Sequence, residues 1–215
     1  MLSSREAESS IVKRLVAVVA LAACAATANA GPREQARRIH DRIAGVPPSA
    51  PVLNQMEAEV AGGDVEGAAM IAMDNPAFYS VTLKNLVTPW TNREQTVFAP
   101  LNDYTATVIG MVRDDLPFNE VLSADILYVG GSGLGLPAAS ASNNDHFEQM
   151  ETRGVNLLTG LTRTTQSGAY GTPPAATAGV LTSRAAAQSF FIAGTNRAMF
   201  RFTLLNHMCR DLEEV

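Results

Sequence analysis

Proline and glycine interrupt this chain at short intervals, which restricts it to short elements of secondary structure. There are 16 glycines and 11 prolines in 215 residues. Between them, apolar residues recur with the three- and four-residue spacing of a helix, as at Leu53, Met56 and Val60. The alternation of apolar and polar residues that is typical of strands is almost absent. The sequence therefore predicts an all-α fold: an irregular multi-helix domain with little or no sheet.

Capping residues and turn residues predict where these helices lie. The expected caps are Asp64, Asn75, Asp145 and either Thr182 or Ser183, and the expected helix ends are Gly45, the pair Gly62-Gly63 and Gly194. The expected helices cover residues 33–44, 50–61, 65–73, 76–87, 102–114, 118–127, 145–161, 183–193 and 196–212. Two long loops rich in Gly, Pro, Ser and Thr remain, at residues 130–144 and 164–178. Structureless loops of this length are unusual inside a compact domain. We expect them either to carry function or to border a neighbouring segment.

The first 30 residues have the pattern of an export signal. Lys13 and Arg14 supply the positive edge, and an unbroken apolar run follows at residues 15–23. This run is shorter than the roughly 20 residues that a membrane-spanning helix needs. The sequence therefore predicts export, with residues 31–215 as the helical domain.

Two routes for processing this signal remain open. Cleavage after a small-x-small motif would occur at Ala30 and leave Gly31 as the first residue. Alternatively, Leu-Ala-Ala-Cys resembles a bacterial lipobox, and Cys24 would then carry a lipid. In either case Cys209 has no partner for a disulfide within the chain. We expect a periplasmic protein or an outer-membrane-anchored lipoprotein of a Gram-negative bacterium, which touches the membrane only through its signal or its lipid.

Charge and histidine spacing exclude several kinds of partner. Acidic residues outnumber basic ones by 21 to 16, which argues against a nucleic-acid-binding face. The histidines are His40, His146 and His207, and no two of them have the spacing of a zinc site on one helix face. The haem-attachment motif CxxCH does not occur in residues 1–215. The sequence therefore predicts no metal and no covalent haem within this chain.

A few residue types would suit polysaccharide chemistry. Asp114, Asp115 and Asp125 could form the pair of carboxylates that glycoside hydrolysis requires, and Trp90 could stack on a sugar ring. The ordinary interpretation is that these carboxylates cap helices or pair with Arg113, and that the tryptophan anchors the core. No catalytic residue can be assigned, and whether the chain is an enzyme stays open.

Three stretches resemble a known family. They are Arg37–Ser49, Met111–Val129, and Gly179–Thr182 followed by Arg197. They are similar to stretches in the domains of unknown function of large exported proteins first noted in planctomycetes, which are associated with cytochrome c modules. The positions that carry the resemblance are Arg38, Gly45, Pro47, Pro48, Arg113, Asp115, Pro117, Phe118, Asp125, Leu181, Thr182 and Arg197.

The resemblance implies a helical scaffold that precedes a haem-bearing segment with CxxCH. We therefore expect the domain to be truncated before such a segment, with haem c possible only if the protein continues past Val215. The implied partner is the cytochrome c segment or another redox protein. The alternative is a periplasmic polysaccharide-binding or polysaccharide-degrading protein. A fragment without its partner should expose an apolar patch around Phe190, Phe191, Phe200 and Phe202.

Overall fold

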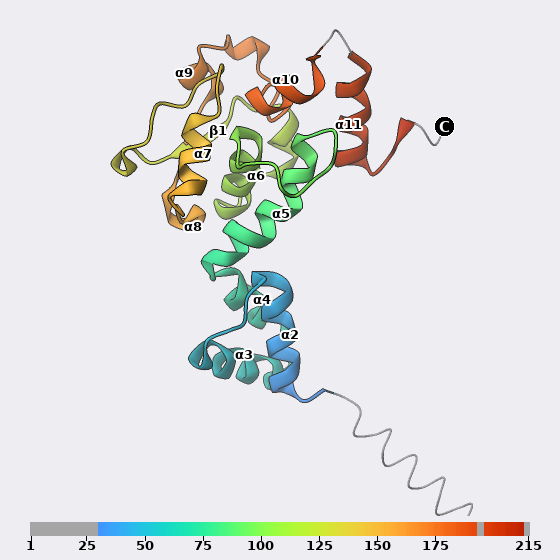
Figure 1. The fold of residues 1–215 in the computed structure, drawn as a ribbon. Coiled ribbons are helices and arrows are strands. Elements are labelled where there is room, and N and C mark those ends of the chain that lie inside the picture. Colours follow the sequence, from blue (N-terminus) through green and yellow to red (C-terminus); the bar gives the residue numbers. More distant parts are fainter. Residues whose placement is uncertain (1–29, 193–195, 213–215) are drawn as a thin grey trace, which may run out of the picture. The chain divides into compact units, whose positions relative to one another are not determined.

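The computed structural model describes residues 30–192 and 196–212 (Figure 1). It confirms the all-α prediction, because 64% of it is helical and its sheet has only two strands. The described residues fall into two compact units. Unit 1 comprises residues 30–42 and 47–71, and unit 2 comprises residues 43–46 and everything from residue 72 onward.

Three predicted helices account for unit 1 and its borders: α2 (Pro32–Ala44), α3 (Ala50–Gly62) and α4 (Val65–Met73). Gly45 and Gly63 end the first two in the left-handed conformation, as the sequence predicts, with φ of 73° and 87°. The carboxylate of Asp64 caps α4 by accepting the Gly67 N–H at 2.7 Å.

Unit 2 begins with one long helical stretch. Asn75 caps it, its side chain accepting the Ala77 N–H at 2.9 Å. The stretch then passes through a π-helical segment, η1 (Phe78–Leu83), and through α5 (Lys84–Val87). A 3-10 turn, η2 (Thr88–Thr91), ends it. The predicted extent of this helix is right, although the π-helical hydrogen bonding was not foreseen.

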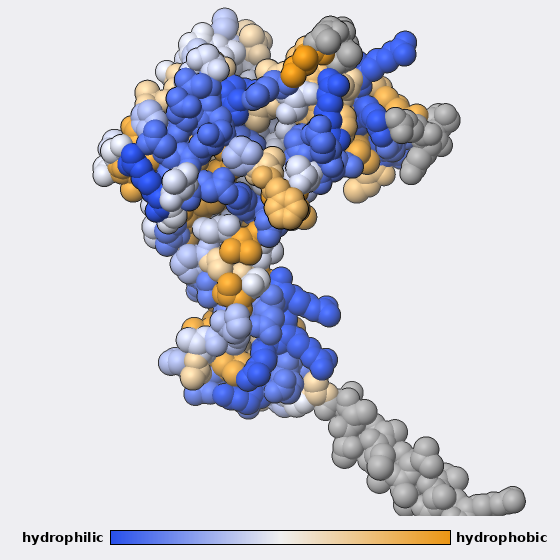
Figure 2. Space-filling model, viewed as in Figure 1, coloured by the Kyte–Doolittle hydropathy of each residue, from blue (hydrophilic) through white to orange (hydrophobic). Residues whose placement is uncertain are grey.

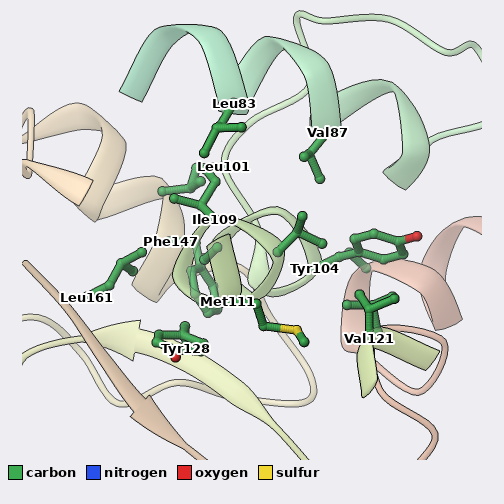
Figure 3. Packing of buried hydrophobic residues seen from close by; sticks show 14 of the residues in the cluster. Leu83, Val87, Leu101, Tyr104, Ile109, Met111, Val121, Tyr128, Phe147 and Leu161 are labelled. Carbon is green, nitrogen blue, oxygen red and sulfur yellow. The ribbon is translucent and has the colours of Figure 1, made fainter. Parts of the chain in front are cut away.

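Helix α6 (Asp103–Arg113) is the centre of unit 2. Asn102, which the prediction placed inside the helix, is its cap and accepts the Thr105 N–H at 3.0 Å. Every residue from Asp103 to Met111 is buried, so the helix is enclosed on all sides and not only along its apolar face. Figure 3 shows the core side chains gathered around it. They come from the preceding helical stretch and from later segments: Leu83, Val87, Leu101, Val121, Tyr128, Phe147 and Leu161.

The prediction of a helix over residues 118–127 is wrong. Only a 3-10 turn, η3 (Phe118–Leu122), forms there, and Phe118 is 45% exposed and not part of a buried stripe. The next residues form strand β1 (Leu127–Gly130), which pairs antiparallel with β2 (Leu161–Thr164). Tyr128 of β1 packs so tightly on α6 that a side chain at Gly110 would lie 2.2 Å from its ring. This packing and the pairing with β2 favour a strand here, and local helix propensity does not reflect either contact.

The predicted helix over residues 145–161 is too long. Helix α7 (Asp145–Thr152) ends early because Gly154 adopts a left-handed φ of 62°, and a short helix, α8 (Leu157–Gly160), follows. Asp145 is the first helical residue and not the cap, and no side chain caps this end. The two expected loops also contain short helices: η4 (Ser132–Leu134) in the first, and α9 (Gln166–Tyr170) and η5 (Pro174–Ala176) in the second.

Two helices complete unit 2. Ser183 caps α10 (Arg184–Phe190) by accepting the Ala186 N–H at 3.2 Å, which decides between the two caps that the sequence allowed. The predicted end of this helix at Gly194 lies outside the described residues. Helix α11 (Asn196–Met208) stops before Leu212, because Cys209 has a φ of 52° and is exposed.

Candidate functional site

The predicted export segment lies almost entirely outside the described residues, and so does Cys24. Within the part of the chain that the structure describes, we find no helix of the length and apolar character that a membrane crossing requires. The choice between cleavage at Ala30 and a lipid on Cys24 therefore stays a prediction.

Arg113 connects the end of α6 to the two-stranded sheet. Its guanidinium donates to both carboxylate oxygens of Asp114, at 2.7 and 3.0 Å, and to the Leu161 carbonyl at 2.8 Å. The Tyr128 hydroxyl donates to the same carboxylate at 2.5 Å. The hydrogen bond from Arg113, followed by that from Tyr128, holds the pKa of Asp114 below its usual value. This arrangement is a structural clamp, as the ordinary interpretation of these residues expects.

Two of the three family-like stretches meet at the buried side chain of Gln166. Its amide donates to one backbone carbonyl of each stretch, at 3.2 and 2.7 Å, and its oxygen accepts the Thr182 hydroxyl at 2.8 Å. Beside it, the Asp125 carboxylate accepts the hydroxyl of Ser167 and its N–H, the latter at 3.1 Å. The hydroxyl bond is the main cause that lowers the pKa of Asp125. The sequence placed Gln166 in a loop and gave no signal for this role.

The remaining positions of the resemblance occupy the surface or the links between helices. Gly45, Pro47 and Pro48 follow α2, and Leu181 is half-buried. The exposed positions are Arg38, Asp115, Pro117, Phe118 and Arg197.

The residues suggested for polysaccharide chemistry do not share a cleft. Asp114 and Asp125 are engaged with the separate partners described above. The Trp90 ring lies edge-on to His207, with 5.6 Å between the centroids, and its carbonyl accepts the Asn206 side chain at 3.0 Å. Unit 2 has a large cleft between η2 and α10, which is described below. None of the three carboxylates lines it, and neither does Trp90.

Two of the histidines have defined structural roles. The His146 Nε2 accepts the Gly130 N–H at 2.8 Å, so Nδ1 carries the proton and donates to the Pro137 carbonyl at 2.7 Å. The Nε2 of His207 and the Tyr104 hydroxyl share a hydrogen bond of 2.8 Å. No group of three metal-ligating side chains occurs among the described residues. The described contacts of these two histidines are thus hydrogen bonds within the fold.

The environment of His207 predicts that stability falls as the pH falls from 7 to 5. Burial lowers the pKa of His207, so between the ordinary value near 6.5 and the lower native value only the unfolded chain binds the proton. The free energy of unfolding should drop by up to about 1.4 kcal/mol per pH unit in that window. Urea unfolding at pH 7, 6 and 5 measures this. The variant His207→Gln should show a flatter dependence, and an equal slope in both proteins would contradict the assignment.

A large cleft of unit 2 has a volume of about 880 Å³. It lies between the end of η2, the segment that follows η2, the end of the first long loop, and α10. Its walls combine polar side chains, among them two arginines and two glutamates, with small apolar residues. Prominent lining residues are Asn92, Arg93, Asn144, Glu148, Arg184 and Gln188. A cleft of this size with convergent polar groups is the best candidate for a ligand site in the described residues.

Arg184 dominates the chemistry of this cleft. Its guanidinium donates to Asn144 Oδ1 at 2.7 Å and to Gln188 Oε1. In the described part of the chain, no carboxylate lies within 4.0 Å of the guanidinium, and its Nε is buried without a hydrogen-bond partner. Sequence reasoning missed this residue. Its only local signal is the four-residue spacing to Gln188 on one helix face.

Known proteins offer no guide to this site. Comparisons of the chain with models of protein families, with curated proteins and with solved structures found no match.

Proposed function

We propose that this chain is an exported helical scaffold that packs against the haem-bearing segment of a c-type cytochrome-associated redox protein. The resemblance of its three stretches supports this function. On this proposal the chain supplies no haem ligand of its own, which agrees with the engaged nitrogens of His146 and His207. The hydrogen bonds of Gln166 join two of the resembling stretches, Met111–Val129 and Gly179–Thr182, into one frame.

The observation that most supports this function is a row of apolar side chains on the outward side of α11. Its inward side packs Phe202 onto Phe190, with 4.8 Å between the ring centroids. On the other side, Phe200, Leu204 and Met208 are spaced at intervals of four residues, which places them in a row along the helix. Phe200 is 59% and Met208 63% exposed. Figure 2 shows hydrophobic residues at the surface among hydrophilic ones in this region. An apolar row of this kind is typical of a surface that another segment covers.

The expected apolar patch is therefore present in part, with different members. Phe190 and Phe202 are buried, whereas Phe191 and Phe200 are exposed as expected. The residues that extend the exposed set are Ile192, Met208 and Leu212.

The test of the scaffold begins with the gene. The reading frame is followed beyond the codon for Val215, and its whole product is exported in cells that mature c-type cytochromes. We expect haem absorbance and a pyridine haemochrome spectrum from the whole product, and neither from residues 31–215 alone. A whole product that is exported and matures without haem would overturn the proposal.

The α11 row also predicts a pair of contrasting substitutions. Phe200→Ser with Met208→Ser should leave the free energy of unfolding within about 0.5 kcal/mol, because exposed side chains contribute little, and should reduce self-association. Phe202→Ser on the same helix should cost about 3 kcal/mol or more, because it empties a buried aromatic site. Urea unfolding and light scattering measure the two effects. Equal destabilisation would mean that the row is packed within the chain.

The large cleft favours a second candidate function, the binding of a polysaccharide. Its lining combines Ser142, Asn143 and Gln188 with charged side chains of both signs. Such groups donate to and accept from sugar hydroxyls. This cleft replaces the grouping of Asp114, Asp115, Asp125 and Trp90 as the proposed site. Titration calorimetry of the exported chain with a panel of neutral and acidic oligosaccharides tests it, and binding to none of them would exclude it.

A further inference from the structure

We propose that the cleft of unit 2 selects acidic polysaccharides, with Arg184 binding the carboxylate of one uronic acid unit. The inference rests on the second candidate function, polysaccharide binding, and names its substrate class.

The main chain at Arg184 is anchored by a buried carboxylate. Asp103, at the start of α6, is fully buried, and it accepts the Arg184 N–H at 2.6 Å and the Ala185 N–H at 3.0 Å. Its other partners are the Tyr170 hydroxyl at 3.2 Å and the N–H of Tyr104 on its own helix at 2.9 Å. The first turn of α10 is thereby fixed to the central helix of the unit. A side chain that starts from so rigid a position can be presented to a ligand at low entropic cost.

The guanidinium of Arg184 keeps its positive charge available to the cleft. Its acceptors, Asn144 Oδ1 and Gln188 Oε1, are neutral amide oxygens, which orient the group without forming an ion pair. Glu148 lies on the same wall, but Asn144 stands between the two charges and donates to Glu148 at 3.2 Å. Because Gln188 turns its oxygen toward Arg184, its NH₂ group has no partner among the described residues and is an available donor. A cation and a free amide donor side by side suit a carboxylate.

The other charges of the cleft favour an anion with a single charge. Glu94 and Glu148 line the cleft with Arg93 and Arg184, so the four charges sum to zero. The cleft therefore has no net positive charge to stabilise a doubly charged phosphate group. Arg184, whose acceptors are neutral amide oxygens, can still pair with a single carboxylate. The rest of the wall combines hydroxyl and amide side chains, which bind sugar hydroxyls, with small apolar residues and Ile192. A volume of about 880 Å³ accommodates a short oligosaccharide.

Calorimetry with matched ligands tests the inference. Tetramers of galacturonate, glucuronate, mannuronate and guluronate are compared with the same tetramers after their carboxylates are reduced to alcohols. We expect at least one uronate to bind about tenfold or more tightly than its reduced form. The variant Arg184→Gln should abolish that difference. Arg163→Gln, which makes the same charge change at an exposed position outside the cleft, should leave it intact.

A second variant guards against a folding effect of Arg184→Gln. Gln188→Glu places a carboxylate next to the guanidinium and should neutralise it through an ion pair four residues apart on α10, while the helix is retained. It too should abolish the preference for uronates. If acidic and reduced tetramers bind equally and neither variant matters, the inference fails while polysaccharide binding stands. If no oligosaccharide binds at all, the second candidate function itself fails.

Discussion

Replacing Gly179 with alanine is expected to destabilise unit 2 by roughly 3–5 kcal/mol. Gly179 has a φ of 53°, and an added Cβ would lie 1.9 Å from the carbonyl oxygen of Val121. That oxygen accepts the Val180 N–H at 2.8 Å, so neither backbone can move away without losing hydrogen bonds. The Gly179 carbonyl is also one of the two that Gln166 binds. A loss of this size is a large fraction of the 5–15 kcal/mol that stabilises a typical domain.

Gly171→Ala is the matched control for this prediction. Gly171 also has a positive φ, 69°, but no atom lies within 4 Å of the position where its Cβ would be. It should therefore cost only the conformational penalty of about 1 kcal/mol. Urea unfolding followed by circular dichroism compares the two variants with the wild-type protein. If they lose the same free energy, the close approach of residues 121 and 179 does not contribute to stability.

The features that the sequence predicted correctly depend on near neighbours. Asp64 and Ser183 cap helices because a short oxygen-bearing side chain reaches a backbone N–H three residues ahead. Gly45 and Gly63 end helices because glycine adopts the left-handed conformation at little cost. Such signals need no knowledge of the rest of the fold, and together they are sufficient to predict the all-α class.

The features that were wrong or missed depend on distant contacts. Residues 118–127 have an acceptable helical pattern, but Leu127 pairs with Thr164 and Tyr128 packs against Gly110. This packing overrides a local propensity that is worth only tenths of a kcal/mol per residue. The early end of α7 has a local signal in Gly154, whose left-handed φ of 62° marks a chain reversal that the apolar pattern concealed.

The cleft could not be predicted from the sequence for the same reason. The side chain of Arg184 bonds to a residue 40 positions away, and its backbone bonds to one 81 positions away. Composition shows that arginines and amides are present, but it does not show which arginine lacks a carboxylate partner. Of the acidic residues chosen from the sequence, Asp114 forms an ion pair with Arg113, and Asp125 accepts the hydroxyl of Ser167.

Replacing Asp103 with alanine is expected to cost about 3–5 kcal/mol. The carboxylate is fully buried. Besides the N–H of Tyr104 on its own helix, it accepts from three donors of other segments, which are two backbone N–H groups of α10 and the Tyr170 hydroxyl. Alanine would leave these three donors without partners in the interior, and each unsatisfied buried donor costs about 1–3 kcal/mol. Asparagine should rescue little, because its NH₂ group would face donors. Urea unfolding gives the loss for both variants.

Asp145→Ala is the control that separates burial from a general effect of acidic residues at helix starts. Asp145 is the first residue of α7 and is exposed, so its removal should cost about 0.5 kcal/mol. Tyr170→Phe removes only one of the three donors and should cost about 1 kcal/mol. If Asp103→Ala cost no more than Asp145→Ala, the start of α10 would not depend on α6. Arg184 would then lack the rigid anchor on which selective carboxylate binding relies.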